Sequence, residues 1–160
     1  MQTLLIWGVP VVILVHNIEE AIWLPRWANQ YAGRWHKPVG AAEFRFAVVV
    51  LSLLAFVLAG LTHISGFGSI WHYLLAAYAL GQAINIFVPH LVVTLVTRHY
   101  APGLITGLVL VLPAAWVFLN HGFSREYLDF ATFGISSVIF IPIVLLSIPL
   151  LFRLGRKLYR

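Results

Sequence analysis

Five long apolar segments constrain what this chain can fold into. They run over Leu4–Leu24, Phe44–Thr62, Ile70–Thr97, Pro102–Leu119 and Ala131–Phe152. The length of each segment is close to the roughly 20 apolar residues that a membrane-spanning helix needs. Because 61% of the residues are hydrophobic and 9% are charged, an ordinary soluble enzyme is excluded. We therefore predict an all-α, polytopic membrane helical bundle of about five transmembrane helices, forming a single domain over residues 1–160.

The first apolar segment resembles a secretory signal peptide only in its position. It lacks a basic N-terminal region and a cleavage site with small residues, and ionisable side chains interrupt its apolar stretch. We therefore expect this segment to be retained as the first helix of the bundle.

The basic residues predict the orientation of the bundle. With five spans, the first loop, the third loop and the C-terminus share one side of the membrane. That side receives nine basic residues, namely Arg26, Arg34, Lys37, Arg45, Arg98, Arg153, Arg156, Lys157 and Arg160. The opposite side receives Arg125. The positive-inside rule then places the N-terminus outside and the C-terminus inside the cell membrane. We expect these charges to contact anionic lipid headgroups, with no nucleic-acid partner.

The first helix carries ionisable residues at a depth where they are costly. His16, Glu19 and Glu20 project onto one face of a helix, within about two turns. Two carboxylates and an imidazole facing lipid would be unfavourable, so this face is expected to point into the bundle or a wet cavity. We interpret the three residues as a functional polar centre in the inner, cytoplasmic half of the membrane.

Other segments supply candidate partners for this centre. The third apolar segment carries polar residues at helical spacing, Tyr78, Gln82 and Asn85. Pro89 cannot donate to the carbonyl of Asn85, so a kink is predicted there. His90, at nearly the depth of His16, is expected to meet the glutamates, and Glu43 is a further candidate on the same side. For Gln82 and Asn85, a substrate contact and an interhelical hydrogen bond are equally compatible with the sequence.

These residues resemble the motifs of a known family. HNIEE at residues 16–20 is similar to the HXXEE motif of the HXXEE-domain family of small integral membrane proteins, whose function is unknown. YAPG at residues 100–103 looks like the YXPG motif of that family, and His90 looks like its additional histidine. The resemblance extends over nearly the whole chain. It implies which positions matter, and it implies no reaction or cofactor.

The YAPG segment also has a mechanical interpretation. Pro102 suits the first turn of a helix, and Gly103 with Gly107 lets that helix approach a neighbour closely. Tyr100 can lie at headgroup level or turn toward the centre. We expect the segment to shape the inner mouth of a cavity without taking part in chemistry.

Three mechanisms remain open for the polar centre. In the first, a divalent metal (zinc, iron or manganese) is held by His16, by Glu19 or Glu20, and by His90, with Glu43 as a tentative extra ligand. A dinuclear site is short of ligands, because the sequence has no second Glu-x-x-His copy. In the second mechanism, the groups act as general acid and base without a metal. In the third, they form a proton or ion relay, or a purely structural device.

We predict a small membrane enzyme, isomerase-, hydrolase- or cyclase-like, that acts on a lipophilic substrate such as a lipid or isoprenoid. The alternative is a proton- or ion-coupled transport or binding protein using the same cluster. The expected substrate-binding residues are Asn85, Gln82, Tyr78, Trp23 and Tyr100. In the metal-free mechanism, the ring candidates for stabilising a cationic intermediate are Trp7, Trp23, Trp27 and Tyr78, while an interfacial position is favoured for Trp27 and Trp35. The first loop, with Trp27 and Trp35, is expected to cover the cavity, and the oligomeric state stays open.

Overall fold

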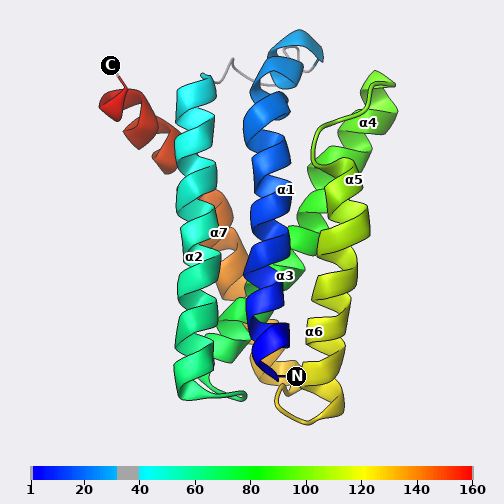
Figure 1. The fold of residues 1–160 in the computed structure, drawn as a ribbon, viewed down its shortest axis with the longest axis vertical. Helices are drawn as coiled ribbons and strands as arrows, with labels where there is room; N and C mark the ends of the chain where they lie inside the picture. The colour runs from blue at the N-terminus through cyan, green and yellow to red at the C-terminus, as the bar shows by residue number, and fades with distance from the viewer. Residues whose placement is uncertain (1, 32–39, 160) are drawn as a thin grey trace.

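The protein is a bundle of long helices, seen in a computed structural model that describes residues 2–31 and 40–159 (Figure 1). The first two spans are single helices, α1 (Gln2–Tyr31) and α2 (Ala41–Ser65). The third comprises α3 (Ile70–Asn85), η1 (Ile86–Leu91) and α4 (Val92–Thr97), and the fourth comprises α5 (Leu104–Thr106), η2 (Gly107–Val111) and α6 (Leu112–Ser124). The fifth span is α7 (Phe130–Leu158). Successive spans run in opposite directions, and the two termini lie at opposite ends of the bundle.

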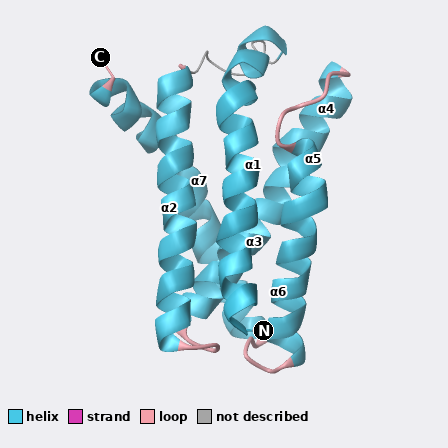
Figure 2. Cartoon of the chain, viewed as in Figure 1, coloured by secondary structure: helices cyan, strands magenta, loops and turns pink. Residues whose placement is uncertain are grey.

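The helices confirm the prediction of an all-α bundle with five apolar spans. In the described residues, five helical spans are long and apolar enough to cross a membrane. Figure 2 shows only helices and loops in this part of the chain, with the loops gathered at the two ends of the bundle. This arrangement satisfies the backbone in lipid, because an α-helix pairs its own N–H and C=O groups.

The first helix is longer than predicted because it continues through Pro25. A proline has no N–H to donate to the carbonyl four residues earlier, which here belongs to Ala21. Arg45 from α2 replaces that donor, since its Nε lies 3.0 Å from the Ala21 oxygen. One side chain thus satisfies the freed carbonyl of α1 and joins α1 to α2 near the basic end of the bundle.

Small residues allow the helices to pack closely at the centre. Six alanines of α2 and α3 are almost completely buried, Ala47, Ala55 and Ala59 in α2 and Ala76, Ala77 and Ala79 in α3. Small side chains let helix backbones approach one another in lipid, where the hydrophobic effect gives no driving force. The fifth helix, α7, is different, because only 6% of its most apolar stretch is buried inside the bundle. Most of α7 therefore presents apolar side chains to the bilayer.

The kink predicted at Pro89 is confirmed. Val88 has non-helical backbone angles (φ −131°, ψ 107°) within the π-helical segment η1. The fourth span also contains a π-helical segment, η2, which begins at Gly107. A Cβ on Gly107 would lie 2.7 Å from Ile86 Cγ1, so the third and fourth spans touch where both are irregular. This contact brings His90 and the start of the fourth span toward α1.

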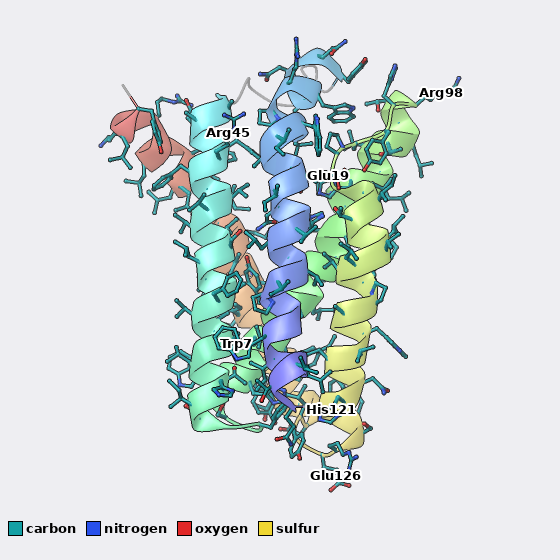
Figure 3. All side chains as sticks on the ribbon, in the orientation of Figure 1. Trp7, Glu19, Arg45, Arg98, His121 and Glu126 are labelled. Atoms are coloured by element: carbon teal, nitrogen blue, oxygen red, sulfur yellow. The ribbon has the colours of Figure 1, made fainter. Side chains whose placement is uncertain are left out.

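The ends of the bundle differ in charge. Figure 3 shows Arg45 and Arg98 at one end and His121 and Glu126 at the other. The basic residues Arg34, Lys37 and Arg160, together with Trp35, lie outside the described residues. The described basic residues therefore agree with the grouping used to predict the orientation, while the side of the membrane that each end faces stays a prediction.

Candidate functional site

Three predicted residues converge inside the bundle. His16 and Glu20 lie one turn apart on α1, and His90 comes from η1. Glu20 Oε1 lies 2.6 Å from His90 Nε2 and 3.4 Å from His16 Nε2. The two imidazole rings meet edge to face with centroids 5.4 Å apart. All three side chains are buried, with exposed fractions of 0% for His16, 2% for His90 and 8% for Glu20.

The nitrogens of the two histidines face the same carboxylate. His16 Nε2 has no hydrogen-bond partner among the described residues, although it is buried. His90 Nε2 lies within hydrogen-bonding distance of both Glu20 Oε1 and the amide nitrogen of Asn85, 3.2 Å away. One ligand atom from each of His16, Glu20 and His90 lies within 4.8 Å of the others. The three residues can therefore hold one metal ion.

Asn17 fixes the helix face that carries these residues. Its amide donates a 2.8 Å hydrogen bond to the hydroxyl of Ser52 on α2, and that hydroxyl donates to the carbonyl of Val48. Both Asn17 and Ser52 are buried. Since a buried polar pair is costly to break, this contact sets the rotation of α1 about its axis.

Glu19 points away from the three converging residues. Its carboxylate accepts hydrogen bonds from the hydroxyls of Tyr100 and Thr106, each at 2.5 Å. The Thr106 hydroxyl also lies 3.1 Å from His16 Nδ1. Figure 3 shows Glu19 on the side of α1 that faces the start of the fourth span. Partial desolvation of the exposed Tyr100 side chain, together with the adjacent carboxylate, raises the pKa of Tyr100 to about 12.

The YAPG segment forms one wall of the centre. Gly103 has a φ of 98°, and a Cβ there would lie 2.8 Å from His90 Cε1 and 3.0 Å from His16 Cε1. The backbone can therefore pass directly over both imidazoles only because residue 103 has no side chain. The segment is closer to the centre than its predicted role at the mouth of a cavity implies, since Tyr100 bonds to Glu19.

The structure does not bring Glu43 into this group. Both of its carboxylate oxygens accept 3.0 Å hydrogen bonds from Arg156 on α7. Together with the position of Glu19, this contact reduces the candidate ligands from five to His16, Glu20 and His90. The sequence suggested Glu43 because it begins a helix at the same end, but its exposed guanidinium partner lies far along the chain.

An apolar cavity of about 240 Å³ adjoins the centre. It lies between α1, α2, the third span and α7, and its apolar walls include Phe140 and Val144 from α7. The polar side chains that line it are Asn17, Glu20, Tyr78, Gln82, Asn85 and His90. Three of the predicted substrate-binding residues, Tyr78, Gln82 and Asn85, therefore share one cavity with Glu20.

The other predicted aromatic residues lie elsewhere. Trp23 and Trp27 line a second, more open pocket with Glu19 and Tyr100, between α1 and the YAPG segment. Trp7 packs near the opposite end, with its ring 6.1 Å from that of His63 (Figure 3). Of the four rings proposed to stabilise a cation, Tyr78 alone lies on the cavity that contains Glu20, among the described residues.

Thr106 is a residue of the site that the sequence did not predict. It links His16 to Glu19, although 90 residues separate it from His16. Threonine is common in membrane helices, and its hydroxyl often bonds within its own helix. The sequence carries no signal for this contact, because it depends on how closely the fourth span approaches α1.

Comparisons with known proteins agree with the HXXEE motif. A family model described as "Protein of unknown function with HXXEE motif" matches residues 7–118, which include the whole centre. The chain is 38% identical over 152 residues to the uncharacterized protein YrkK of Bacillus subtilis (strain 168), covering 91% of each chain. No solved structure matches the chain. The chain therefore belongs to the family of proteins with the HXXEE motif.

Proposed function

We propose that this chain is a small membrane-embedded enzyme in which His16, Glu20 and His90 hold a divalent metal ion beside a lipophilic substrate. The observation that carries this proposal is the convergence of three buried ligand atoms, one each from His16, Glu20 and His90, within 4.8 Å of one another, where His16 Nε2 has no hydrogen-bond partner among the described residues. A buried nitrogen without a partner costs about 1–3 kcal/mol. A metal ion that accepts electron pairs from both imidazoles and the carboxylate would remove that cost.

The donor atoms fit particular metals. Two imidazole nitrogens and one carboxylate oxygen suit zinc, or iron and manganese with open positions. Such an ion, when bound, polarises an oxygen of the substrate or activates water. Glu20 and His90 both line the apolar cavity, so that cavity is where the substrate would meet the centre.

The walls of the cavity favour a lipophilic substrate. Most of its lining is apolar, and Tyr78, Gln82 and Asn85 supply polar groups on one side. Its volume of about 240 Å³ is below the roughly 300–1,000 Å³ of pockets that enclose drug-sized ligands. We therefore expect it to take one segment of a lipid or isoprenoid, with the remainder of the molecule in the bilayer.

A metal-free mechanism is the second candidate, and one distance favours it. Glu20 Oε1 lies 2.6 Å from His90 Nε2, the separation of a short hydrogen bond between a carboxylate and an imidazole. Such a pair can act as proton donor and acceptor without a metal. The two mechanisms differ in whether activity depends on a bound ion.

Elemental analysis of detergent-purified protein tests the metal. We expect about one ion per chain in the wild type and a background value in His16→Ala and His90→Ala. Glu43→Gln is the matched control, because this carboxylate bonds to Arg156 and should leave the ion in place. The metal-assisted mechanism would be overturned if wild-type protein purified without chelators contains no metal and takes up none when zinc, iron or manganese is added.

A separate pair of assays distinguishes an enzyme from a transporter. Lipid that co-purifies with the protein would be identified and then followed in membranes for chemical conversion, in parallel with flux measured in proteoliposomes. Conversion that disappears in Glu20→Gln supports the enzyme. Vectorial flux that requires Glu19 or Glu20, without covalent change in the transported molecule, would support the transport alternative instead.

We also propose that the basic end of the bundle faces the cytoplasm, with the N-terminus outside. The charge asymmetry supports this orientation through the positive-inside rule. The chain contains no cysteine, so single cysteines can report it directly. A membrane-impermeant maleimide applied to intact cells should label Ser124→Cys and spare Thr97→Cys, and the reverse result would contradict this orientation.

A further inference from the structure

The two adjacent glutamates of the HXXEE motif have different surroundings. Glu20 lies among the two histidines, whereas Glu19 faces Tyr100 and Thr106. We propose that Glu20 is the ligand and that Glu19 is a positioning residue, which acts through Thr106 to fix the tautomer of His16. This inference rests on the proposed metal centre for its role in function. Its geometry stands independently of any metal.

The hydroxyl of Thr106 has one proton to donate. The carboxylate of Glu19 can only accept, and its Oε2 lies 2.5 Å from Thr106 Oγ1. The Thr106 proton therefore goes to Glu19. Thr106 Oγ1 also lies 3.1 Å from His16 Nδ1. Because its proton goes to Glu19, the hydroxyl oxygen must accept a hydrogen bond from that nitrogen. His16 thus carries its proton on Nδ1.

This assignment determines the state of the other ring nitrogen. A neutral imidazole with its proton on Nδ1 has a lone pair on Nε2. His16 Nε2 points at Glu20 and has no hydrogen-bond partner among the described residues. The lone pair therefore faces the point where His90 and Glu20 also converge. Metal-bound histidines commonly hold their other nitrogen in a hydrogen bond of this kind, which fixes the orientation of the ring.

Tyr100 holds Glu19 in the geometry that this arrangement needs. Its hydroxyl donates to Glu19 Oε1, so each carboxylate oxygen has one fixed donor. The Tyr100 oxygen in turn accepts a 3.2 Å hydrogen bond from the backbone N–H of Ile105. The YAPG segment and the HNIEE segment are thereby joined by one chain of hydrogen bonds that ends at His16 Nδ1.

Nitrogen NMR of histidine-labelled, metal-free protein tests the tautomer directly. The His16 signal is assigned by its loss in His16→Gln, and the spectra are recorded near pH 8, above the ordinary histidine pKa of about 6.5. We expect a proton on Nδ1 in the wild type. In Thr106→Val, which removes the hydroxyl and keeps the shape, we expect the proton to move to Nε2, facing Glu20. A wild-type ring protonated on Nε2, or on both nitrogens, would overturn the proposal.

Metal affinity provides the second readout. We expect zinc to bind about 10–100-fold more weakly to Thr106→Val, the usual effect of removing a partner of a metal-bound histidine. Glu19→Gln should fall in the same range and should keep its stoichiometry. Thr106→Ser should restore both tautomer and affinity, because it returns the hydroxyl. Thr97→Val is the control, since that hydroxyl bonds to the backbone of its own segment.

The two hypotheses fail in different ways. If zinc binds neither to the wild type nor to any variant, while the His16 tautomer responds to Thr106→Val as expected, the metal centre is overturned and the positioning role of Glu19 stands. If zinc binds with one ion per chain and equal affinity in wild type, Thr106→Val and Thr106→Ser, the positioning role is overturned and the metal centre stands.

Discussion

Each end of the bundle contains buried histidines, but only one end brings them to a carboxylate among the described residues. At the basic end, His16 and His90 share Glu20. At the opposite end, His72 is fully buried among aromatic rings, with Phe67 at 4.6 Å and Phe118 at 5.3 Å between centroids. Its Nδ1 accepts a hydrogen bond from the backbone N–H of Gly68. His16 and His72 are thus equally buried, but His16 lies beside a carboxylate and His72 lies among aromatic rings.

Asp129, one of two acids at the opposite end, already has hydrogen-bond donors. Asp129 caps α7 by accepting from the Thr132 N–H, and it also accepts from the Tyr73 hydroxyl. The ring of His72 bonds instead to the backbone of Gly68. Burial alone therefore does not make a histidine a ligand. A site needs several donor atoms aimed at one point, and the HXXEE spacing provides two of them on one helix.

The largest predicted effect comes from removing one carboxylate from each end in turn, Glu20 and Asp129. Glu20→Gln should reduce the metal content from about one ion per chain to background, because an amide does not replace the charge that offsets a divalent cation. Asp129→Asn should leave the ion in place, since that acid serves as a helix cap. Elemental analysis with zinc titration calorimetry measures both. Wild-type metal content in Glu20→Gln would remove the distinction between the two ends.

The second prediction compares two glycines of positive φ at opposite ends of the bundle, Gly66 (φ 84°, ψ 168°) and Gly103 (φ 98°, ψ −21°). Gly66 has a φ of 84°, and a Cβ there would meet no heavy atom within 4 Å. Gly66→Ala should therefore cost only the strain of a backbone conformation that is almost restricted to glycine, about 1–3 kcal/mol. Gly103→Ala should cost about 1–2 kcal/mol for its left-handed backbone and about 1–3 kcal/mol more for the contacts of the new Cβ with both imidazoles. Thermal unfolding in detergent measures the difference. Equal losses would mean that the backbone at Gly103 can move away from the centre.

The smallest effect is a pH dependence confined to the opposite end. Hydrogen bonds from Thr132 and Tyr73 lower the pKa of Asp129 from an ordinary 3.8 to about 2. A carboxyl with a lowered pKa stabilises the folded state above its unfolded pKa, and this stability is lost as the pH falls through the folded value. Unfolding temperatures should therefore decline between about pH 4 and pH 2, and Asp129→Asn should flatten that part of the profile. An unchanged profile would show that the cap contributes no stability there.

The sequence predicted the parts of the centre that depend on local spacing. His16 and Glu20 share a face because they are four residues apart, and Pro89 marks the kink that carries His90. The five spans followed from their apolar length. These features need no knowledge of which helices are neighbours.

The parts that the sequence did not predict depend on how the helices pack. The direction of Glu19 is set by Tyr100 and Thr106, which arrive from a span more than 80 residues away. Glu43 forms an ion pair with Arg156 on the last helix, and no local sequence pattern indicates that pairing. The position of Trp23 also depends on helix packing. Trp23 is on the same helix as Glu20, and yet it lines a different pocket.

The position of α7 has a consequence for engineering. This helix lines the cavity with Phe140, Ile141, Val144, Leu145, Ile148 and Phe152, and none of these apolar side chains bonds to the histidines or glutamates of the centre. Its side chains can therefore be enlarged or trimmed without changing His16, Glu20 or His90. Under the proposed function, a library restricted to this one helix would change which hydrocarbon shapes fit and leave the centre intact, so selectivity could be engineered separately from reactivity.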